Sequence, residues 1–304
     1  MRKYCLMVLM ALAGVVWGQP PDTVWTRRFG GVNSDEAYSL ALTPDGGCVM
    51  AGLTYSYGAG DADVYLVKVD SNGVIEWQRT YGGPEWDVAY AIQRLLDGGF
   101  ILSGMTQSFG IGTPTRYNTY ILRTDSSGDT LWTRAFGGEL DDWCYDITDL
   151  SNGEFVAAGF TRSYGAVYDD IFLLRVSSTG DSLQSLVLRG PHNERAYSVA
   201  RSEDGGFLVS GAVESYGYIV RLNSALDTLW SRTYPGSSPN HDLSFGRVLC
   251  DLTARWFLVG NMWPWQTGHG EIYVSRIDDI GDTLWTRTIA DSFFTRRAYA
   301  AKIT

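Results

Sequence analysis

Residues 127–138 read SGDTLWTRAFGG, and variants of this phrase return along the whole chain. Aligning the variants on the tryptophan gives six equivalent positions: Trp25, Trp77, Trp132, Gln184, Trp230 and Trp285. Successive positions are 52, 55, 52, 46 and 55 residues apart. Periods of this size are typical of solenoids, propellers and other arrays, in which each repeat is one supersecondary unit. The content of one period distinguishes among them.

Four strand-like segments fill the first period: residues 37–42, 48–54, 64–70 and 74–83. Turn dipeptides such as Asp45-Gly46 separate apolar runs, as a tight hairpin requires. Glycine is abundant, and no apolar segment after the N-terminus follows a helical period. The sequence therefore predicts an all-β fold, namely a β-propeller of four-stranded blades with five complete blades and an incomplete sixth.

The first 18 residues resemble a secretory signal peptide. Arg2 and Lys3 form a basic start, an apolar run continues to Val16, and Gly18 is a small residue near a cleavage position. The run is shorter than the ~20 apolar residues that span a bilayer, and no later segment reaches that length. We expect a protein that is not membrane-spanning and is secreted to the extracellular space, the cell surface or the periplasm.

One β-propeller domain is expected over residues 19–304. Its repeat units cover approximately 32–83, 84–138, 139–190, 191–236 and 237–290, with a partial unit at 291–304. Residues 23–31 supply an outer strand without its blade, and residues 298–304 supply only an inner strand. Two middle strands of a sixth blade are then missing, which predicts a truncated reading of a longer protein with edges prone to pair with other chains.

The repeated phrase is expected to dock each blade on the next. Trp132, Arg134 and Phe136 share one face of an extended strand, because side chains alternate along it. We predict that this is the outermost strand, whose tryptophan packs on the next blade while the arginine head stays in water. The docking residues are Trp25, Trp77, Trp132, Trp230 and Trp285. Close packing by the neighbouring blade is also expected over the recurrent mid-strand glycines: Gly52, Gly104, Gly159, Gly211 and Gly260.

The repeat as a whole resembles the repeats of secreted bacterial β-propeller proteins. The shared pattern is tryptophan, Gly-Gly, an acidic residue before an Ala-Tyr strand, Asp-Gly-Gly, Gly-x-Thr-x-Ser and a Tyr-x-x-Lys/Arg-x-Asp strand, and it covers residues 24–304. The resemblance implies the fold and a secreted or cell-surface location, without an assigned chemistry.

Binding is expected at one end of the propeller, where the longer connections after the second and outer strands lie; we call it the long-loop end. Aromatic rings with polar tips suit sugar faces or a partner protein. Tyr117, Trp263 and Trp265 lie outside the repeat pattern and are candidate binding residues. Aromatic residues at one shared repeat position are interpreted as plugs between blades: Tyr57, Phe109, Tyr164 and Tyr216.

A carboxylate recurs just before the inner strand, at Asp35, Asp87, Asp142 and Glu194. These positions predict acidic groups near the mouth of the central channel. Two interpretations follow. Each carboxylate caps a turn by accepting backbone N–H groups or pairs with an arginine, which is favoured; alternatively, the ring holds a cation.

All three histidines also fall in loops of the long-loop end: His192, His241 and His269. With Glu194 and Asp242 nearby, they could bind a transition metal or perform acid–base chemistry, but their spacing does not require either role. We assign no catalytic residue and no metal site. The favoured function is a noncatalytic module that binds protein or carbohydrate, and the alternative is a degenerate hydrolase or lyase that uses the histidines.

The charge and the cysteine pattern of the sequence limit the classes of partner and cofactor that are expected. A net charge of −10 disfavours nucleic acid. No CxxC or CxxH pair occurs, so the cysteines after the signal peptide are interpreted as small apolar residues in the core: Cys48, Cys144 and Cys250. No cofactor is expected. A calcium ion is the alternative, at acidic residues that lie a blade apart instead of recurring every nine residues: Asp61, Asp63, Asp169 and Asp170.

Overall fold

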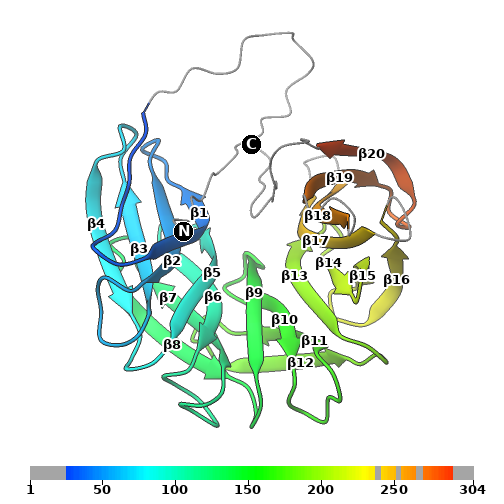
Figure 1. Ribbon diagram of the computed structural model, residues 1–304, viewed down its shortest axis with the longest axis horizontal. Helices are drawn as coiled ribbons and strands as arrows, with labels where there is room; N and C mark the ends of the chain where they lie inside the picture. Colours follow the sequence, from blue (N-terminus) through cyan, green and yellow to red (C-terminus); the bar gives the residue numbers. More distant parts are fainter. Residues whose placement is uncertain (1–24, 237–240, 251–254, 265–269, 290–304) are drawn as a thin grey trace.

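The computed structural model of this chain describes residues 25–236, 241–250, 255–264 and 270–289. These residues form 20 β-strands in five four-stranded antiparallel sheets (Figure 1). They contain no helix, and hence none that could cross a membrane. The predictions of an all-β fold and of a repeated four-strand unit are confirmed.

Each sheet uses four consecutive strands in chain order. Sheet 1 contains β1 (Asp35–Leu42), β2 (Cys48–Thr54), β3 (Asp63–Val69) and β4 (Ile75–Tyr81). Sheet 2 contains β5 (Asp87–Arg94), β6 (Phe100–Thr106), β7 (Asn118–Thr124) and β8 (Thr130–Phe136). Sheet 3 contains β9 (Asp142–Asp149), β10 (Phe155–Thr161), β11 (Asp170–Val176) and β12 (Ser182–Leu188). Sheet 4 contains β13 (Glu194–Arg201), β14 (Phe207–Val213), β15 (Tyr216–Leu222) and β16 (Thr228–Tyr234). Sheet 5 contains β17 (His241–Cys250), β18 (Trp256–Pro264), β19 (Glu271–Ile277) and β20 (Thr283–Ile289).

The five sheets form an arc in which the first strand of each sheet lies inside and the fourth outside (Figure 1). Consecutive inner strands pack on one another, β1 on β5, β5 on β9, β9 on β13 and β13 on β17. Apolar side chains fill the space between neighbouring sheets. Val64 and Leu66 of β3, for example, share one core with Phe100 and Leu102 of β6. This burial between sheets stabilises a repeat that cannot bury its apolar faces alone.

A β-bulge interrupts the inner strand of every sheet. The pairing of β1 with β2 shifts between Ala37 and Ser39, which makes Tyr38 the extra residue. The same shift recurs in the other four sheets at Tyr90, Tyr145, Tyr197 and Gly246. A bulge bends its strand and redirects the side chain that it carries.

The recurrent mid-strand glycines lie opposite these bulges. A Cβ atom on Gly52 would lie 1.8 Å from the carbonyl oxygen of Glu36, and one on Gly104 equally close to that of Val88. Both oxygens belong to the inner strand of the same sheet. The prediction that a neighbouring blade packs over these glycines is therefore wrong. Glycine is required because the bulge pushes the backbone of the adjacent strand into the space of a side chain.

The repeated tryptophan docks on the last turn of the next sheet. Trp132 lies against Gly180, and its Nε1 donates a hydrogen bond to the carbonyl of Ser178 at 2.8 Å. Arg134 lies beside it, with its guanidinium carbon 5.9 Å from the centre of the Trp132 ring. The same packing joins Trp25 to Gly73, Trp77 to Gly128 and Trp230 to Gly281. Docking is confirmed at these four positions, whereas Trp285 packs on Phe257 of its own sheet with ring centres 6.1 Å apart.

Gln184 occupies the docking position between sheets 3 and 4. Its Nε2 donates to the carbonyl of Ala225 at 2.9 Å, much as the indole of Trp132 donates to Ser178. The glycine of the docking turn is also replaced, by Leu226, which has a φ of 66° and is 2% exposed. A Cβ on the equivalent Gly180 would lie 2.8 Å from the Trp132 ring, so a side chain at this turn position takes space that a docking tryptophan needs, and the two departures from the repeat occur together.

Candidate functional site

Four tyrosines at the bulges contact one another in sequence around the inside of the arc. The ring centres of Tyr38 and Tyr90 are 5.3 Å apart, those of Tyr90 and Tyr145 are 5.2 Å apart, and those of Tyr145 and Tyr197 are 5.2 Å apart. All four rings are half-buried. The inner strands of sheets 1 to 4 therefore present a continuous row of tyrosines.

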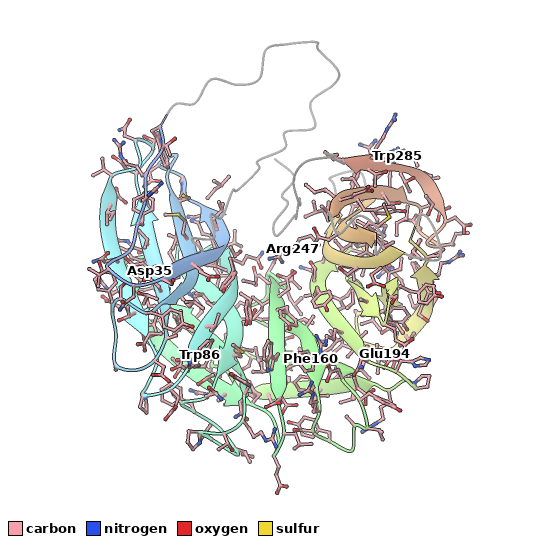
Figure 2. The ribbon with its side chains drawn as sticks, viewed as in Figure 1. Asp35, Trp86, Phe160, Glu194, Arg247 and Trp285 are labelled. Carbon is pink, nitrogen blue, oxygen red and sulfur yellow. The ribbon has the colours of Figure 1, made fainter. Side chains whose placement is uncertain are left out.

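Further aromatic residues extend this row towards the long-loop end. Trp143 packs on Tyr145 and on Phe160, with ring centres 6.0 and 5.6 Å apart, and Tyr117 meets Trp143 edge-on at 5.2 Å. Trp86, labelled with Phe160 in Figure 2, contacts Tyr55 and shares an apolar cluster with Trp143. Phe160 itself is 3% exposed and lies beneath these rings. We call the partly exposed set the aromatic surface: Tyr38, Tyr55, Trp86, Tyr90, Tyr117, Trp143, Tyr145 and Tyr197.

The hydroxyls of Tyr38, Tyr90 and Tyr145 stay protonated at neutral pH. Burial raises the pKa of Tyr38, Tyr90 and Tyr145 well above the usual value of a tyrosine. The Tyr38 hydroxyl already donates to Glu36 at 2.8 Å. The surface thus combines apolar ring faces with hydroxyl groups that donate and accept hydrogen bonds.

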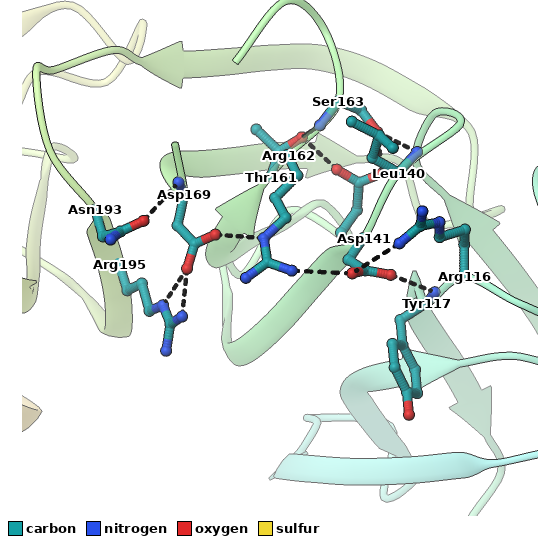
Figure 3. A network of polar contacts seen from close by, with 11 residues as sticks. Arg116, Tyr117, Leu140, Asp141, Thr161, Arg162, Ser163, Asp169, Asn193 and Arg195 are labelled. Carbon is teal, nitrogen blue, oxygen red and sulfur yellow. Dashed lines mark hydrogen bonds and ion pairs between the residues drawn. The ribbon is translucent and has the colours of Figure 1, made fainter. Parts of the chain in front are cut away.

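A chain of alternating charges borders the aromatic surface (Figure 3). Arg162 donates from Nη1 to Asp141 at 3.1 Å and from Nε to Asp169 at 2.6 Å. Arg195 donates from Nε to the other oxygen of Asp169, also at 2.6 Å. Arg116 approaches Asp141 from the far side at 3.6 Å. We call these residues the charged cluster: Arg116, Asp141, Arg162, Asp169 and Arg195.

The charged cluster and the aromatic surface are one continuous structure. The guanidinium carbons of Arg195 and Arg162 lie 4.8 and 5.9 Å from the centre of the Phe160 ring, within the range of cation–π attraction. Asp141 also accepts a hydrogen bond from the backbone N–H of Tyr117 at 3.3 Å. A pocket of about 200 Å³ beside the cluster is lined by Arg162, Asp169, Tyr168 and their neighbours.

Tyr117 is the predicted binding residue that the structure brings into this site. The His192 side chain pairs instead with Glu214, its Nδ1 lying 2.8 Å from that carboxylate, and both side chains are about half exposed. The side chains of the other four predicted binding residues lie outside the described part of the structure: His241, Trp263, Trp265 and His269. The structure therefore does not join His192 to the aromatic surface.

The recurrent carboxylates before the inner strands are internal braces. Asp142 accepts hydrogen bonds from Gly138 N–H at 2.7 Å and Ser163 Oγ at 2.8 Å, and it also bonds Thr161. Asp35 repeats this pattern with Gly31, Ser56 and Thr54, and Asp87 repeats it with Gly83 and Ser108. The turn-capping interpretation is confirmed for these three residues.

These carboxylates do not offer an exposed charged ring. Asp87 and Asp142 are fully buried and Glu194 is 6% exposed, while Figure 2 shows Asp35 and Glu194 on opposite sides of the arc. Glu194 accepts a bond from the backbone N–H of His192 at 3.3 Å. Burial raises the pKa of Asp87 and Glu194. Their positions suit bracing between consecutive sheets better than capture of a cation from solvent.

The acidic residues considered for calcium are engaged in different ways. Asp169 is matched by two guanidinium groups, so its oxygens are not free for a cation. Asp63 accepts backbone N–H bonds from Ala59 and Gly60, and Asp61 is exposed. Asp170 accepts a bond from Gly190 N–H. In the described ranges, no three acidic, histidine or cysteine side chains form a group that could hold a metal ion.

Three of the aromatic residues at the shared loop position pack on a ring of their own sheet and stay 40–48% exposed, so these contacts are not the predicted plugs between blades. Tyr57 packs on Tyr65, Phe109 on Tyr120 and Tyr164 on Phe172, with ring centres 5.6 to 5.8 Å apart.

Of the three cysteines predicted to lie in the core, Cys144 is buried, and burial raises the pKa of its thiol to about 12. Cys48 and Cys250 are partly exposed.

Sequence reasoning missed most of the aromatic surface. Tyr38, Tyr90 and Tyr197 follow an alanine at one repeat position, and Tyr145 follows Cys144, so a recurrent signal was present. Its meaning depended on the bulge, which turns the tyrosine at this position in four of the five sheets towards its neighbours. Trp86 and Trp143 are adjacent in sequence to Asp87 and Asp142. The repeat pattern predicts a role for these two carboxylates and none for the two tryptophans.

Comparisons with known proteins support the fold and do not identify a function. No protein-family model and no curated protein sequence matches this chain. A protein of unknown function from Bacteroides caccae is similar in structure, with 14% identity, a TM-score of 0.53, and coverage of 84% of this chain and 82% of that one. A protein from Lactobacillus plantarum has 11% identity and a TM-score of 0.54, with coverage of 86% and 72%.

Proposed function

We propose that this chain is a noncatalytic binding protein whose ligand docks on the aromatic surface. The observation that carries the proposal is the row of half-buried rings that runs over the inner strands of four sheets. The repeated tryptophans dock consecutive sheets along the outer rim, whereas these rings join the inner strands and keep part of their surface exposed. Partly exposed rings with hydroxyl tips suit carbohydrate or a protein partner.

A binding screen tests the proposal. We expect the purified chain to retain a ligand from a panel of glycans and extracellular proteins, and Tyr117→Ala to weaken retention. Tyr216→Ala is the matched control, because Tyr216 is 49% exposed and lies outside the aromatic surface. Equal retention by both variants would contradict the location of the site. Turnover in a hydrolase or lyase panel, lost in His241→Ala, would instead favour the alternative enzyme.

The finer architecture is part of the same proposal. The five sheets act as successive blades of a β-propeller, and residues 25–31 act as the outer strand of an incomplete sixth. Trp25 supports this role, since it packs on Gly73 of sheet 1 as Trp132 packs on Gly180 of sheet 3. Trp25→Ala is then expected to lower the melting temperature, as a docking tryptophan should. An unchanged melting temperature in this variant would contradict the assignment of residues 25–31 to the propeller.

Secretion is proposed from the sequence of residues 1–18, which lie outside the described residues. Expression of the full chain with fractionation of cells and medium tests it. N-terminal sequencing of the secreted chain should begin near residue 19. A chain that stays in the cytosol at full length would contradict this part of the proposal.

A further inference from the structure

Arg162 and Arg195 lie together where the charged cluster meets the aromatic surface, and a buried carboxylate holds both. The Asp169 side chain is 2% exposed and accepts Nε–H from each arginine at 2.6 Å. Both guanidinium groups also lie over the Phe160 ring. Their positions are thus set by the protein before any ligand arrives, which reduces the ordering cost of binding.

Each guanidinium keeps hydrogen-bonding capacity for a ligand. Arg162 uses Nε and Nη1 on Asp169 and Asp141, and Arg195 uses Nε and Nη2 on Asp169. Nη2 of Arg162 and Nη1 of Arg195 donate to no acceptor among the described residues. The two side chains are 46% and 37% exposed. Arginine donors in this state match carboxylate and sulfate oxygens.

The exposure of the charged groups also favours an anion. The arginine side chains of the charged cluster are 37–46% exposed, whereas its two aspartates are 13% and 2% exposed. The carboxylates next to it in sequence are buried, at 0–6% exposed: Asp142, Asp170 and Glu194. An anionic group of a ligand that approaches this surface therefore meets guanidinium donors first.

We propose that the Arg162–Arg195 pair and the adjoining aromatic surface bind an anionic polysaccharide. One sugar unit places its carboxylate or sulfate on the two guanidinium groups, and neighbouring units lie along the rings of Tyr145, Trp143 and Tyr117. This inference rests on the proposed binding function and specifies its ligand. A neutral glycan offers no anionic group to the two preoriented arginines.

Affinity electrophoresis in gels that contain a polysaccharide tests this inference. The probes are polygalacturonate and alginate, which carry carboxylates, dextran sulfate, which carries sulfates, and unmodified dextran as the neutral reference. We expect retardation by at least one anionic polymer and none by dextran, with retardation weaker at higher salt. The carboxylate and sulfate probes distinguish the two sources of negative charge.

Two variants act on the arginines without leaving Asp169 unpaired. Arg162→Gln keeps Arg195 on Asp169, and Arg195→Lys keeps a positive charge but loses the planar fork. Each should weaken binding about tenfold, the effect of losing one charge-assisted hydrogen bond. Arg79→Gln is the control, because Arg79 also lies 5.9 Å from a tryptophan ring and pairs with an aspartate, but on the outer strand β4.

The outcomes separate this inference from the proposed function. Loss of anionic binding in Arg162→Gln and Arg195→Lys, with Arg79→Gln unchanged, supports the inference. If a neutral glycan or a protein binds, and Tyr117→Ala weakens that binding while both arginine variants do not, the inference is overturned and the binding function stands. If anionic polymers bind equally well to all variants, or no anionic polymer binds, the inference is overturned. Binding that is indifferent to Tyr117→Ala also contradicts the proposed function.

Discussion

The guanidinium of Arg247 lies 2.7 Å from the carboxylate of Asp146, although Arg247 belongs to sheet 5 and Asp146 to sheet 3. Ser198 of the intervening sheet donates to the other oxygen of Asp146 at 2.6 Å. The three residues share one repeat position, directly after the bulge. Figure 2 shows Arg247 on the inner side of the arc, near β9. A polar contact thus connects sheets that are two apart.

Replacing Arg247 by serine, the residue at the equivalent positions of sheets 1 and 4, should destabilise the protein. Asp146 and Arg247 are only 11% and 15% exposed, so Asp146 would keep a poorly solvated charge without its partner. The expected loss is about 3 kcal/mol in the free energy of unfolding, measured by denaturant titration. The double variant Asp146→Ser/Arg247→Ser should recover much of that loss. A double variant as unstable as the sum of the single ones would show that the two groups do not interact.

Trp132→Ala should lower stability more than Gln184→Ala, although both remove a docking side chain. Loss of the indole removes apolar contacts with the turn at Gly180 as well as a hydrogen bond, at a cost of about 3 kcal/mol. Gln184 contributes mainly the bond to Ala225, worth about 1 kcal/mol. Thermal melting of the two variants checks the order. Equal losses would contradict the assigned docking role.

Restoring tryptophan at position 184 should succeed only with a second change. In Gln184→Trp, the indole would compete for space with the buried Leu226, so this single variant should be less stable than the parent. Gln184→Trp/Leu226→Gly copies the Trp–Gly pair of the other docking sites and should be more stable than Gln184→Trp. A Gln184→Trp variant that is stable on its own would show that Leu226 does not fill the docking position.

Gly104→Ala should disrupt the bulge at Tyr90. The added methyl group would meet the carbonyl oxygen of Val88 at 1.8 Å, so the two strands must separate or lose their register. We expect a loss of several kcal/mol, seen as a lower melting temperature. Gly165→Ala is the control, because that position has a φ of 81° and no atom within 4 Å of the new methyl group. It should cost only about 1 kcal/mol for the left-handed backbone. Similar losses in both variants would remove the steric explanation.

Asp63→Asn should stabilise the protein at neutral pH. Asp63 Oδ1 and Asp87 Oδ2 both lie within 2.6 Å of the point where a Cβ on Gly82 would be, so the two buried carboxylates are close. Burial raises the pKa of both, and the charge of Asp63 raises that of Asp87 further. The equivalent of Asp63 in sheet 2 is Asn118, which lies beside Asp142 in the same way. The variant thus copies a pairing that the chain already contains.

The direction of the pKa shifts fixes how the stabilisation by Asp63→Asn should vary with pH. A carboxyl whose pKa is raised by folding binds more protons in the native state, so stability falls as pH rises from the unfolded pKa through the folded one. Asp63→Asn removes one such group and lowers the pKa of Asp87. The gain should be about 1 kcal/mol at pH 7 and should vanish near pH 3, where both carboxyls of the parent are protonated. Denaturant titrations at the two pH values measure it. A gain at pH 3 as large as at pH 7 would assign the effect to packing.

The repeat, the four-strand unit and the docking face followed from the sequence alone. Alternation along Trp132, Arg134 and Phe136 is a local property of an extended chain, and turn dipeptides such as Asp45-Gly46 act over a few residues. The carboxylate brace at Asp35 was also foreseen, because acidic side chains often accept backbone N–H groups at turns. Such features are set by neighbouring residues and repeat from one unit to the next.

The candidate site was decided by the tertiary structure. A bulge depends on the register between two strands, and register alone turned Tyr38, Tyr90, Tyr145 and Tyr197 from strand residues into one row. The charged cluster joins sheets 2, 3 and 4 through four loop residues and Arg195 of β13, and these residues do not occur in every repeat. The contact of Asp146 with Arg247 requires the curvature of the whole arc. Each of these depends on strand register or on how sheets pack on one another, which is a sum of contacts between distant parts of the chain, so the recurrent tyrosines in the sequence did not by themselves reveal the row.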